Sequence, residues 1–243
     1  MNDSPHSGST PTGWRSVLSA TVRLILFRIS QVELTRLNWQ HLGAGLMCTW
    51  LVGMGRYWDN PRVGLLQHLG TGSLVYIFIL SLFLWLLIWP LRPRHWSYFR
   101  VLTFVSLVSP PAVLYAIPVE KFVGLDTANA INAWFLAIVA TWRVALLVFF
   151  LRRLAELNWF SVITATLLPL TLIVVVLVQL NLEKVVMSMM SGMGSSPSPN
   201  DAAYVVLAVL SLLAYLLFLP LVICYLVLVV KYQAIDRFKK RTE

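Results

Sequence analysis

The sequence predicts an all-α integral membrane protein, a polytopic bundle of about six transmembrane helices preceded by an amphipathic interfacial helix. Three observations lead to this prediction. Hydrophobic residues make up 58% of the 243 residues and charged residues only 12%, whereas a soluble domain carries about 25% charged residues. Apolar stretches of about 20 residues, long enough to cross a bilayer, follow one another along the chain. The connections between them are alternately rich and poor in Lys and Arg, as the topology of multi-pass proteins requires.

The chain is expected to begin with a disordered tail and a surface helix. Residues 1–13, MNDSPHSGSTPTG, are rich in Ser, Thr, Pro and Gly and lack apolar anchors, which is typical of disorder. In residues 14–37 helical spacing gathers two faces. The apolar face holds Trp14, Val17, Leu18, Val22, Ile25, Ile29 and Val32, and the polar face holds Arg15, Ser16, Ser19, Arg23, Ser30 and Glu33. A basic amphipathic helix suits the membrane surface; packing on the protein's own loops is the alternative.

Six candidate spans make up the predicted helix bundle, residues 38–231. They cover residues 38–55, 73–91, 98–117, 130–151, 159–180 and 204–230. The first is the weakest because it contains Gln40, His41 and several small residues. The sixth is long enough to tilt or to extend beyond the membrane. A basic cytoplasmic tail, residues 232–243, is predicted to follow it.

The distribution of Lys and Arg predicts that both termini are cytoplasmic. Fourteen of the 19 fall in the N-terminal segment, the connections after the second and fourth spans, and the C-terminal tail. Four fall in the other connections, and the last is Arg143. Because basic loops stay in the cytoplasm, we expect an integral protein of the bacterial inner (plasma) membrane. The formal charge of +9 then serves contacts with the lipid bilayer and its anionic headgroups. Nucleic acid is not an expected partner, and membrane-protein partners stay open.

Arg143 stands alone among apolar residues inside the fourth span. A cation at that depth is costly and is normally partnered. One interpretation is structural: Arg143 donates to backbone carbonyls freed by prolines, or to a hydroxyl of Ser109, Thr141 or Thr164, and holds helices together. The other is functional: Arg143 binds an anion or a lipid headgroup in a polar cavity. Trp142, Asn132 and Glu120 are the further candidate binding residues.

Four prolines are predicted to break helices: Pro110, Pro111, Pro169 and Pro220 lie inside the third, fifth and sixth spans. Proline has no backbone N–H and leaves a carbonyl of the preceding turn without its donor. In a membrane such carbonyls are tolerated where they face protein or a cavity.

No group of residues predicts catalysis. The sequence has no Gly-x-Ser-x-Gly, no phosphate loop and no paired aspartates within a span. Cys48, Cys224 and the four histidines lack the spacing of metal ligands. We therefore expect no metal, no cofactor and no enzymatic activity. The favoured function is a non-enzymatic membrane scaffold, organiser or complex subunit. The alternative is a transporter or permease-like protein for an anionic or lipidic solute, with Arg143 in a cavity beside a Pro-broken third helix.

Overall fold

The computed structural model describes residues 13–55, 64–182 and 202–242, and all regular secondary structure in these ranges is helical. The first part of the chain forms α1 (Trp14–Ile25), α2 (Gln31–Thr35), α3 (Trp39–Gly55), α4 (Leu65–His68), α5 (Thr71–Ile88) and η1 (Trp89–Leu91). The rest forms α6 (Tyr98–Leu107), η2 (Pro110–Ala116), η3 (Val119–Lys121), α7 (Leu125–Arg153), α8 (Trp159–Gln179) and α10 (Ala202–Thr242). All but the last residue of the predicted N-terminal tail lies outside the described residues.

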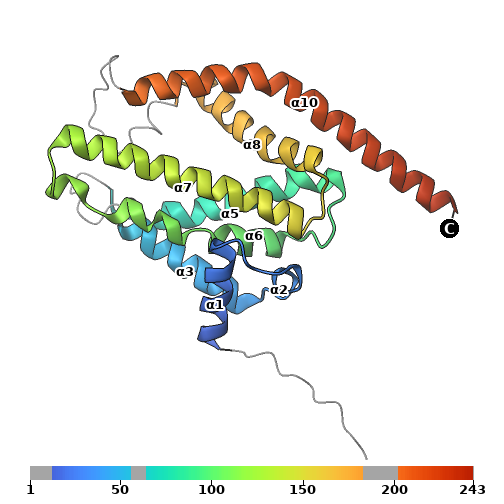
Figure 1. Cartoon of the computed structure of the whole chain (residues 1–243), viewed down its shortest axis with the longest axis horizontal. Helices are drawn as coiled ribbons and strands as arrows, with labels where there is room; N and C mark the ends of the chain where they lie inside the picture. The colour runs from blue at the N-terminus through green and yellow to red at the C-terminus, as the bar shows by residue number, and fades with distance from the viewer. Residues whose placement is uncertain (1–12, 56–63, 183–201, 243) are drawn as a thin grey trace, which may run out of the picture.

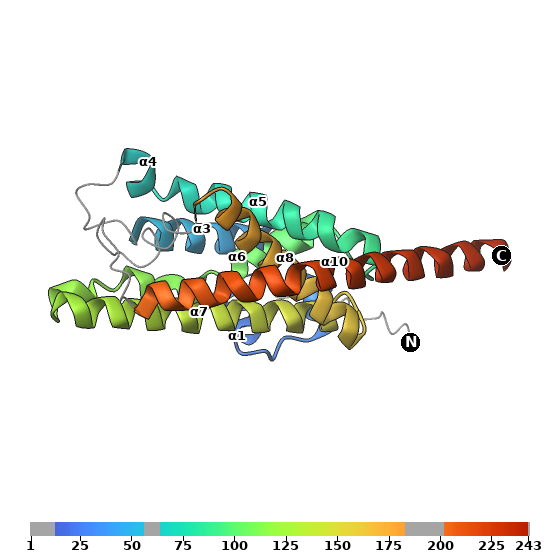
Figure 2. The same cartoon turned by 90° about the horizontal axis from the view of Figure 1, so that it is seen from above.

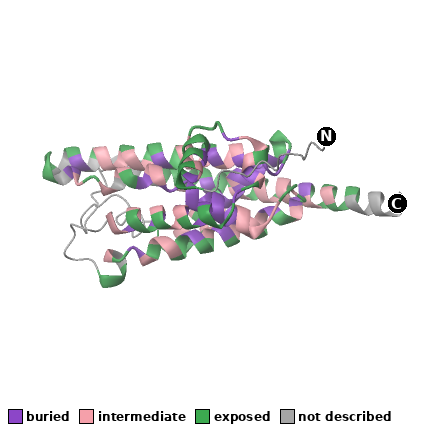
Figure 3. Ribbon diagram, turned by 90° about the horizontal axis from the view of Figure 1, so that it is seen from below, coloured by how far each residue is buried: buried purple, intermediate pink, exposed green. Residues whose placement is uncertain are grey.

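The long helices run side by side in a bundle (Figures 1 and 2). α6 occupies its centre, because residues 101–109 are all buried and both α3 and α5 pack against it. Figure 3 shows the buried residues gathered in the middle of the bundle. The rings of Phe104 and Phe150 stack there with their centroids 4.0 Å apart and join α6 to α7. α10 packs mainly on α8 and projects beyond the other helices (Figure 2).

Within the described ranges, four helices are long and apolar enough to cross a membrane: Thr71–Leu91, Ala130–Arg153, Trp159–Gln179 and Ala208–Ile235. They coincide with four of the six predicted spans. At the place of the first predicted span, α3 has 17 residues, or about 25 Å at 1.5 Å per residue, against a hydrocarbon core of about 30 Å. At the place of the third, α6 is short and is followed by η2. The structure therefore agrees with a helical bundle that contains apolar helices of membrane-spanning length. That the chain has six spans stays a prediction.

The prediction of one amphipathic helix over residues 14–37 is wrong in one respect: the segment forms two helices. α1 ends in a Schellman turn, in which the backbone N–H of Arg28 donates to the Arg23 carbonyl at 2.7 Å and that of Phe27 to the Leu24 carbonyl at 3.0 Å. This turn puts Phe27 at a φ of 60°, a left-handed conformation that helices commonly use to end. Ser30 then starts α2 as its N-cap.

Two of the four predicted helix breaks are also wrong. α8 continues through Pro169 and α10 through Pro220. A single proline removes one hydrogen bond from the ladder, and membrane helices tolerate this when nearby groups compensate. In α8 only the carbonyl of Ala165, four residues before Pro169, loses its helical donor, and the Thr171 hydroxyl adds hydrogen bonds to the neighbouring Leu167 and Leu168 carbonyls at 3.0 and 3.1 Å. α10 runs on to Thr242 as one curved helix (Figure 1), so the predicted tail continues the last helix instead of forming a separate segment.

Candidate functional site

The break after α6 frees a backbone carbonyl inside the bundle. Neither Pro110 nor Pro111 has an N–H, so the α-helical ladder stops and the chain tightens into η2. The N–H of Ala112, which would donate to Val108 in an α-helix, donates instead to the Ser109 carbonyl at 2.9 Å. The Val108 carbonyl therefore needs another donor. The predicted break at Pro110 and Pro111 is confirmed.

Arg143 supplies a donor to that carbonyl. Its Nε–H donates to the Val108 oxygen across a long 3.4 Å, which links α7 to the end of α6. The side chain is half-buried. Among the residues that the structure describes, the remaining guanidinium N–H groups have no acceptor within hydrogen-bonding distance. Two of the three hydroxyls expected as alternatives are engaged elsewhere: Ser109 pairs with Thr49, and Thr164 donates to Phe160.

Trp142 holds a different part of the chain. Its indole Nε1–H donates to the carbonyl oxygen of Ile25 at 3.0 Å. Ile25 is the last residue of α1, whose final carbonyls have no partner within the helix. Nearby, the ring of Phe27 meets that of Phe149 edge-on, with centroids 5.8 Å apart. Together these contacts fix the end of α1 against α7.

The other two candidate binding residues do not join Trp142 and Arg143. Asn132 is half-buried in α7 and precedes Arg143 by eleven residues, or about 16 Å along the helix. The backbone of Glu120 lies in η3, and its side chain is outside what the structure describes. The candidate site therefore centres on Trp142 and Arg143, whose side chains bond to neighbouring segments.

A second polar cluster lies beside the α6 break, between α3 and α6. The hydroxyls of Thr49 and Ser109 are 2.6 Å apart, and both side chains are buried. One turn earlier, a Cβ on Gly45 would come within 2.9 Å of the backbone carbon of Ser106. α3 and α6 therefore touch through small residues, as is common for helices in membranes. Sequence inspection had not singled out this seam, although the glycines of residues 43–55 were a signal for it.

The connection between α7 and α8 meets the segment before α6 at one end of the bundle, which we call the basic end (residues 92–100 and 152–158). The Glu156 carboxylate accepts hydrogen bonds from Arg94 at 2.8 Å and from Gln31 of α2 at 2.6 Å. The N–H of Arg94 donates to the Ala155 carbonyl at 3.1 Å. This node joins three segments that are far apart in sequence, and no local pattern predicts it.

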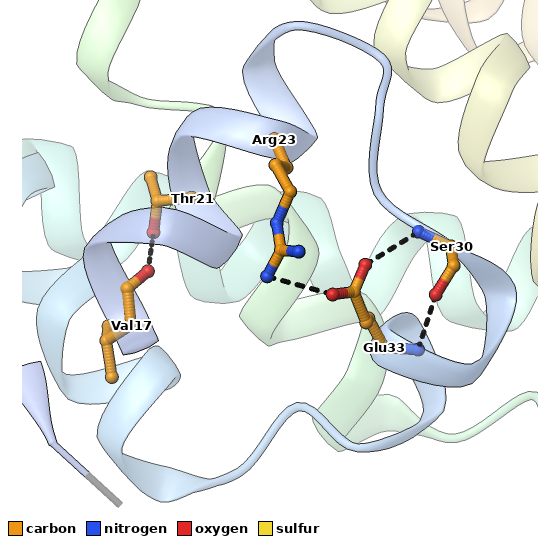
Figure 4. Close-up of polar contacts among 5 residues, drawn as sticks. All are labelled: Val17, Thr21, Arg23, Ser30 and Glu33. Atoms are coloured by element: carbon orange, nitrogen blue, oxygen red, sulfur yellow. Dashed lines mark hydrogen bonds and ion pairs between the residues drawn. The ribbon is translucent and has the colours of Figure 1, made fainter. Parts of the chain in front are cut away.

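Sequence inspection also missed how α2 is built (Figure 4). The Ser30 hydroxyl accepts from the Glu33 N–H at 3.2 Å, while the Glu33 carboxylate accepts from the Ser30 N–H at 2.9 Å. This is a capping box, and its signature Ser-x-x-Glu is present in the sequence. The other oxygen of Glu33 lies 2.8 Å from the Arg23 guanidinium, so α2 folds back on α1.

The described residues contain no group of three His, Cys, Asp or Glu side chains placed to hold a metal ion. Comparisons of the chain with models of protein families, with curated proteins and with solved structures find no match. The site is therefore defined by its own geometry: a cation in an apolar helix, bonded at the break of a neighbouring helix.

Proposed function

We propose that this chain is a non-enzymatic membrane scaffold or complex subunit. The observation that supports this best is the hydrogen bond from Arg143 to the Val108 carbonyl, which joins α7 to the broken third segment. An intramembrane cation used in this way satisfies a carbonyl that would otherwise lie unpaired in the bundle. Its role is then to hold helices in place.

We further propose six spans, with both termini in the cytoplasm of a bacterial cell whose inner membrane holds the protein. Helices lie at all six predicted places, with α3 as the short first span and α6 with η2 as the broken third. The basic end carries five arginines, at positions 92, 94, 100, 152 and 153, and α10 projects on that side (Figure 1). Basic residues favour the cytoplasmic side. In this arrangement α1 lies in the cytoplasmic interface.

A permease-like function for an anionic or lipidic solute is the second candidate. One observation favours it: the terminal guanidinium nitrogens of half-buried Arg143 have no acceptor among the described residues. A guanidinium with free N–H groups binds carboxylates and phosphates through paired hydrogen bonds. The helix break at Pro110 is a further feature that transporters place at their binding sites.

Thermal unfolding of the purified full-length protein separates the two candidates. Wild type, Arg143→Leu and Arg143→Lys are compared without anions and with inorganic phosphate or phosphatidylglycerol. Arg153→Leu is the matched control, because it removes an exposed cation from the end of the same helix. For a scaffold we expect Arg143→Leu to unfold at a lower temperature than wild type and Arg153→Leu, because it leaves the Val108 carbonyl without its donor, at a cost of about 1–3 kcal/mol.

The response to anions decides the outcome. A scaffold gives the same anion-induced shift in wild type and in Arg143→Leu. A permease site gives a shift in wild type that Arg143→Leu abolishes, Arg143→Lys partly keeps and Arg153→Leu leaves intact. That second result would overturn the scaffold proposal.

A further inference from the structure

α1 has three faces, each formed by residues three or four apart. Val17, Ala20 and Leu24 are buried against the protein, with exposed fractions of 2%, 7% and 0%. A second stripe is apolar yet open: Trp14 is 69% exposed, Leu18 62% and Val22 53%. The third stripe is polar and exposed, and consists of Arg15, Ser19 and Arg23. One face therefore packs on the bundle, one remains apolar without a partner, and one is suited to water.

The structure also shows which way these faces point. α1 runs across the bundle, whereas α7 and α10 run along it (Figure 1), so α1 lies close to the plane of a membrane that the long helices cross. The Arg23 side chain extends to Glu33 of α2 (Figure 4), and Gln31 of α2 is bonded to Glu156 at the basic end. The polar face is thus turned toward the basic end. At 100° per residue, the centre of the open apolar stripe lies about 100° from the centre of the polar face around the helix.

The depth of α1 agrees with an interfacial position. Its last residue, Ile25, is bonded to Trp142, which precedes Arg153 at the end of α7 by eleven residues, or about 16 Å. A headgroup layer is about 5–8 Å thick, and an interfacial helix is buried about 5–10 Å into the boundary with the acyl chains. Together these thicknesses amount to about 10–18 Å, a range that includes the distance of about 16 Å expected from the helical rise.

The positive charge of residues 14–37 is complementary to the negative charge of anionic lipids. Arg15, Arg28 and Arg36 are exposed, and among the described residues their guanidinium groups have no hydrogen-bond or ion-pair partner. Arg23 is the one arginine of the segment that is paired with its single carboxylate, Glu33. Phosphate groups of lipids are the anions available at the depth where these cations lie, and arginine binds phosphate through two parallel hydrogen bonds.

We propose that α1 and α2 form a binding surface for anionic phospholipids in the leaflet at the basic end. Trp14, Leu18 and Val22 insert among the acyl chains, and Arg15, Arg28 and Arg36 bind lipid phosphates. This inference rests on the interfacial position of α1 proposed above, and it is independent of whether Arg143 serves a scaffold or a permease.

Spin labels at two adjacent positions test the orientation. In the full-length protein with Cys48→Ser and Cys224→Ser, a nitroxide is attached to either Leu18→Cys or Ser19→Cys, and the protein is placed in nanodiscs. We expect the label at 18 to collide mainly with oxygen, which dissolves in acyl chains, and the label at 19 mainly with a water-soluble nickel chelate. Equal access of the chelate to both labels places α1 in water. Shielding of both labels places it under a protein partner or a second copy. Either result overturns the proposal.

The preference for anionic over zwitterionic lipid tests whether Arg15, Arg28 and Arg36 bind lipid phosphates. Native mass spectrometry counts phosphatidylglycerol and phosphatidylcholine molecules bound to the full-length protein from an equal mixture. The variant Arg15→Gln/Arg28→Gln/Arg36→Gln is compared with Lys231→Gln/Lys239→Gln/Lys240→Gln, which removes the same charge from the end of α10. We expect the α1–α2 variant to lose phosphatidylglycerol preference by about fivefold for each arginine that binds a lipid, and the control to retain most of it. An unchanged preference, or an equal loss in the control, overturns the proposal.

Discussion

Trp142 and Arg143 are neighbours in sequence, yet they hold different segments of the chain. The indole N–H of Trp142 lies 3.0 Å from the Ile25 carbonyl at the end of α1, and Nε of Arg143 lies 3.4 Å from the Val108 carbonyl at the end of α6. Both acceptors are carbonyls that the ends of helices leave without an internal donor. α7 therefore fixes two neighbouring helix ends with two consecutive side chains.

Loss of the indole donor should loosen the end of α1. Trp142→Phe keeps an aromatic ring but leaves the Ile25 carbonyl without its partner, which costs about 1–3 kcal/mol. We expect faster amide hydrogen exchange over residues 24–29 and a lower unfolding temperature. Trp134→Phe is the control, because Trp134 lies on the same helix and is 69% exposed. Equal effects of the two substitutions would contradict a specific role for Trp142.

The close approach of α3 and α6 predicts an asymmetric response at two glycines. At Gly45 an added methyl group would overlap the backbone of Ser106, and overpacking of this kind costs about 1–3 kcal/mol. At Gly43 nothing lies within 4 Å of the position that an added methyl group would take, so alanine there should be neutral or stabilising by up to about 1 kcal/mol through helix propensity. Thermal unfolding of Gly45→Ala and Gly43→Ala measures the difference. If both are tolerated equally, the two helices do not pack as described.

The capping box should matter more than the ion pair that shares Glu33. Ser30→Ala removes the N-cap acceptor of α2, worth about 1 kcal/mol. Arg23→Gln removes an ion pair whose side chains are 45% and 31% exposed, and exposed pairs contribute less than about 1 kcal/mol. Hydrogen exchange at the Glu33 amide, which donates to Ser30, should therefore accelerate about fivefold in Ser30→Ala and less in Arg23→Gln. The reverse order would show that α2 depends on Arg23.

Reporter fusions test the proposed topology. Because Lys and Arg gather in alternate connections, fusions in those connections should report cytoplasm and fusions in the others the outside. The expected cytoplasmic positions are Thr10, Arg94, Arg153 and Lys240, and the expected outside positions are Arg62, Lys121 and Pro197. A cytoplasmic reporter at Arg62 would remove the short helix α3 from the set of spans.

Some features of the fold followed from local chemistry alone. Apolar length predicted helices at six places, and the paired prolines predicted the break after α6, because two consecutive residues without an N–H stop the ladder wherever they stand. The single prolines Pro169 and Pro220 were wrongly predicted to break their helices, because one missing N–H removes only one hydrogen bond of the ladder. Pro169 removes the donor of one carbonyl, that of Ala165, and α8 continues through this single gap.

At the candidate site, too, some properties followed from the sequence and others only from the tertiary structure. The sequence by itself determined that Arg143 is a cation in an apolar helix and must find oxygen partners, because hydrocarbon offers none. Which oxygen it meets was decided by tertiary structure: Val108 lies 35 residues away and reaches Arg143 because η2, which follows it, packs against α7. Likewise the sequence determined that α1 is amphipathic, but only its packing divided the apolar residues into a buried stripe and an open one. Periodicity reports the direction in which a side chain points along a helix, whereas what lies in that direction depends on segments distant in sequence.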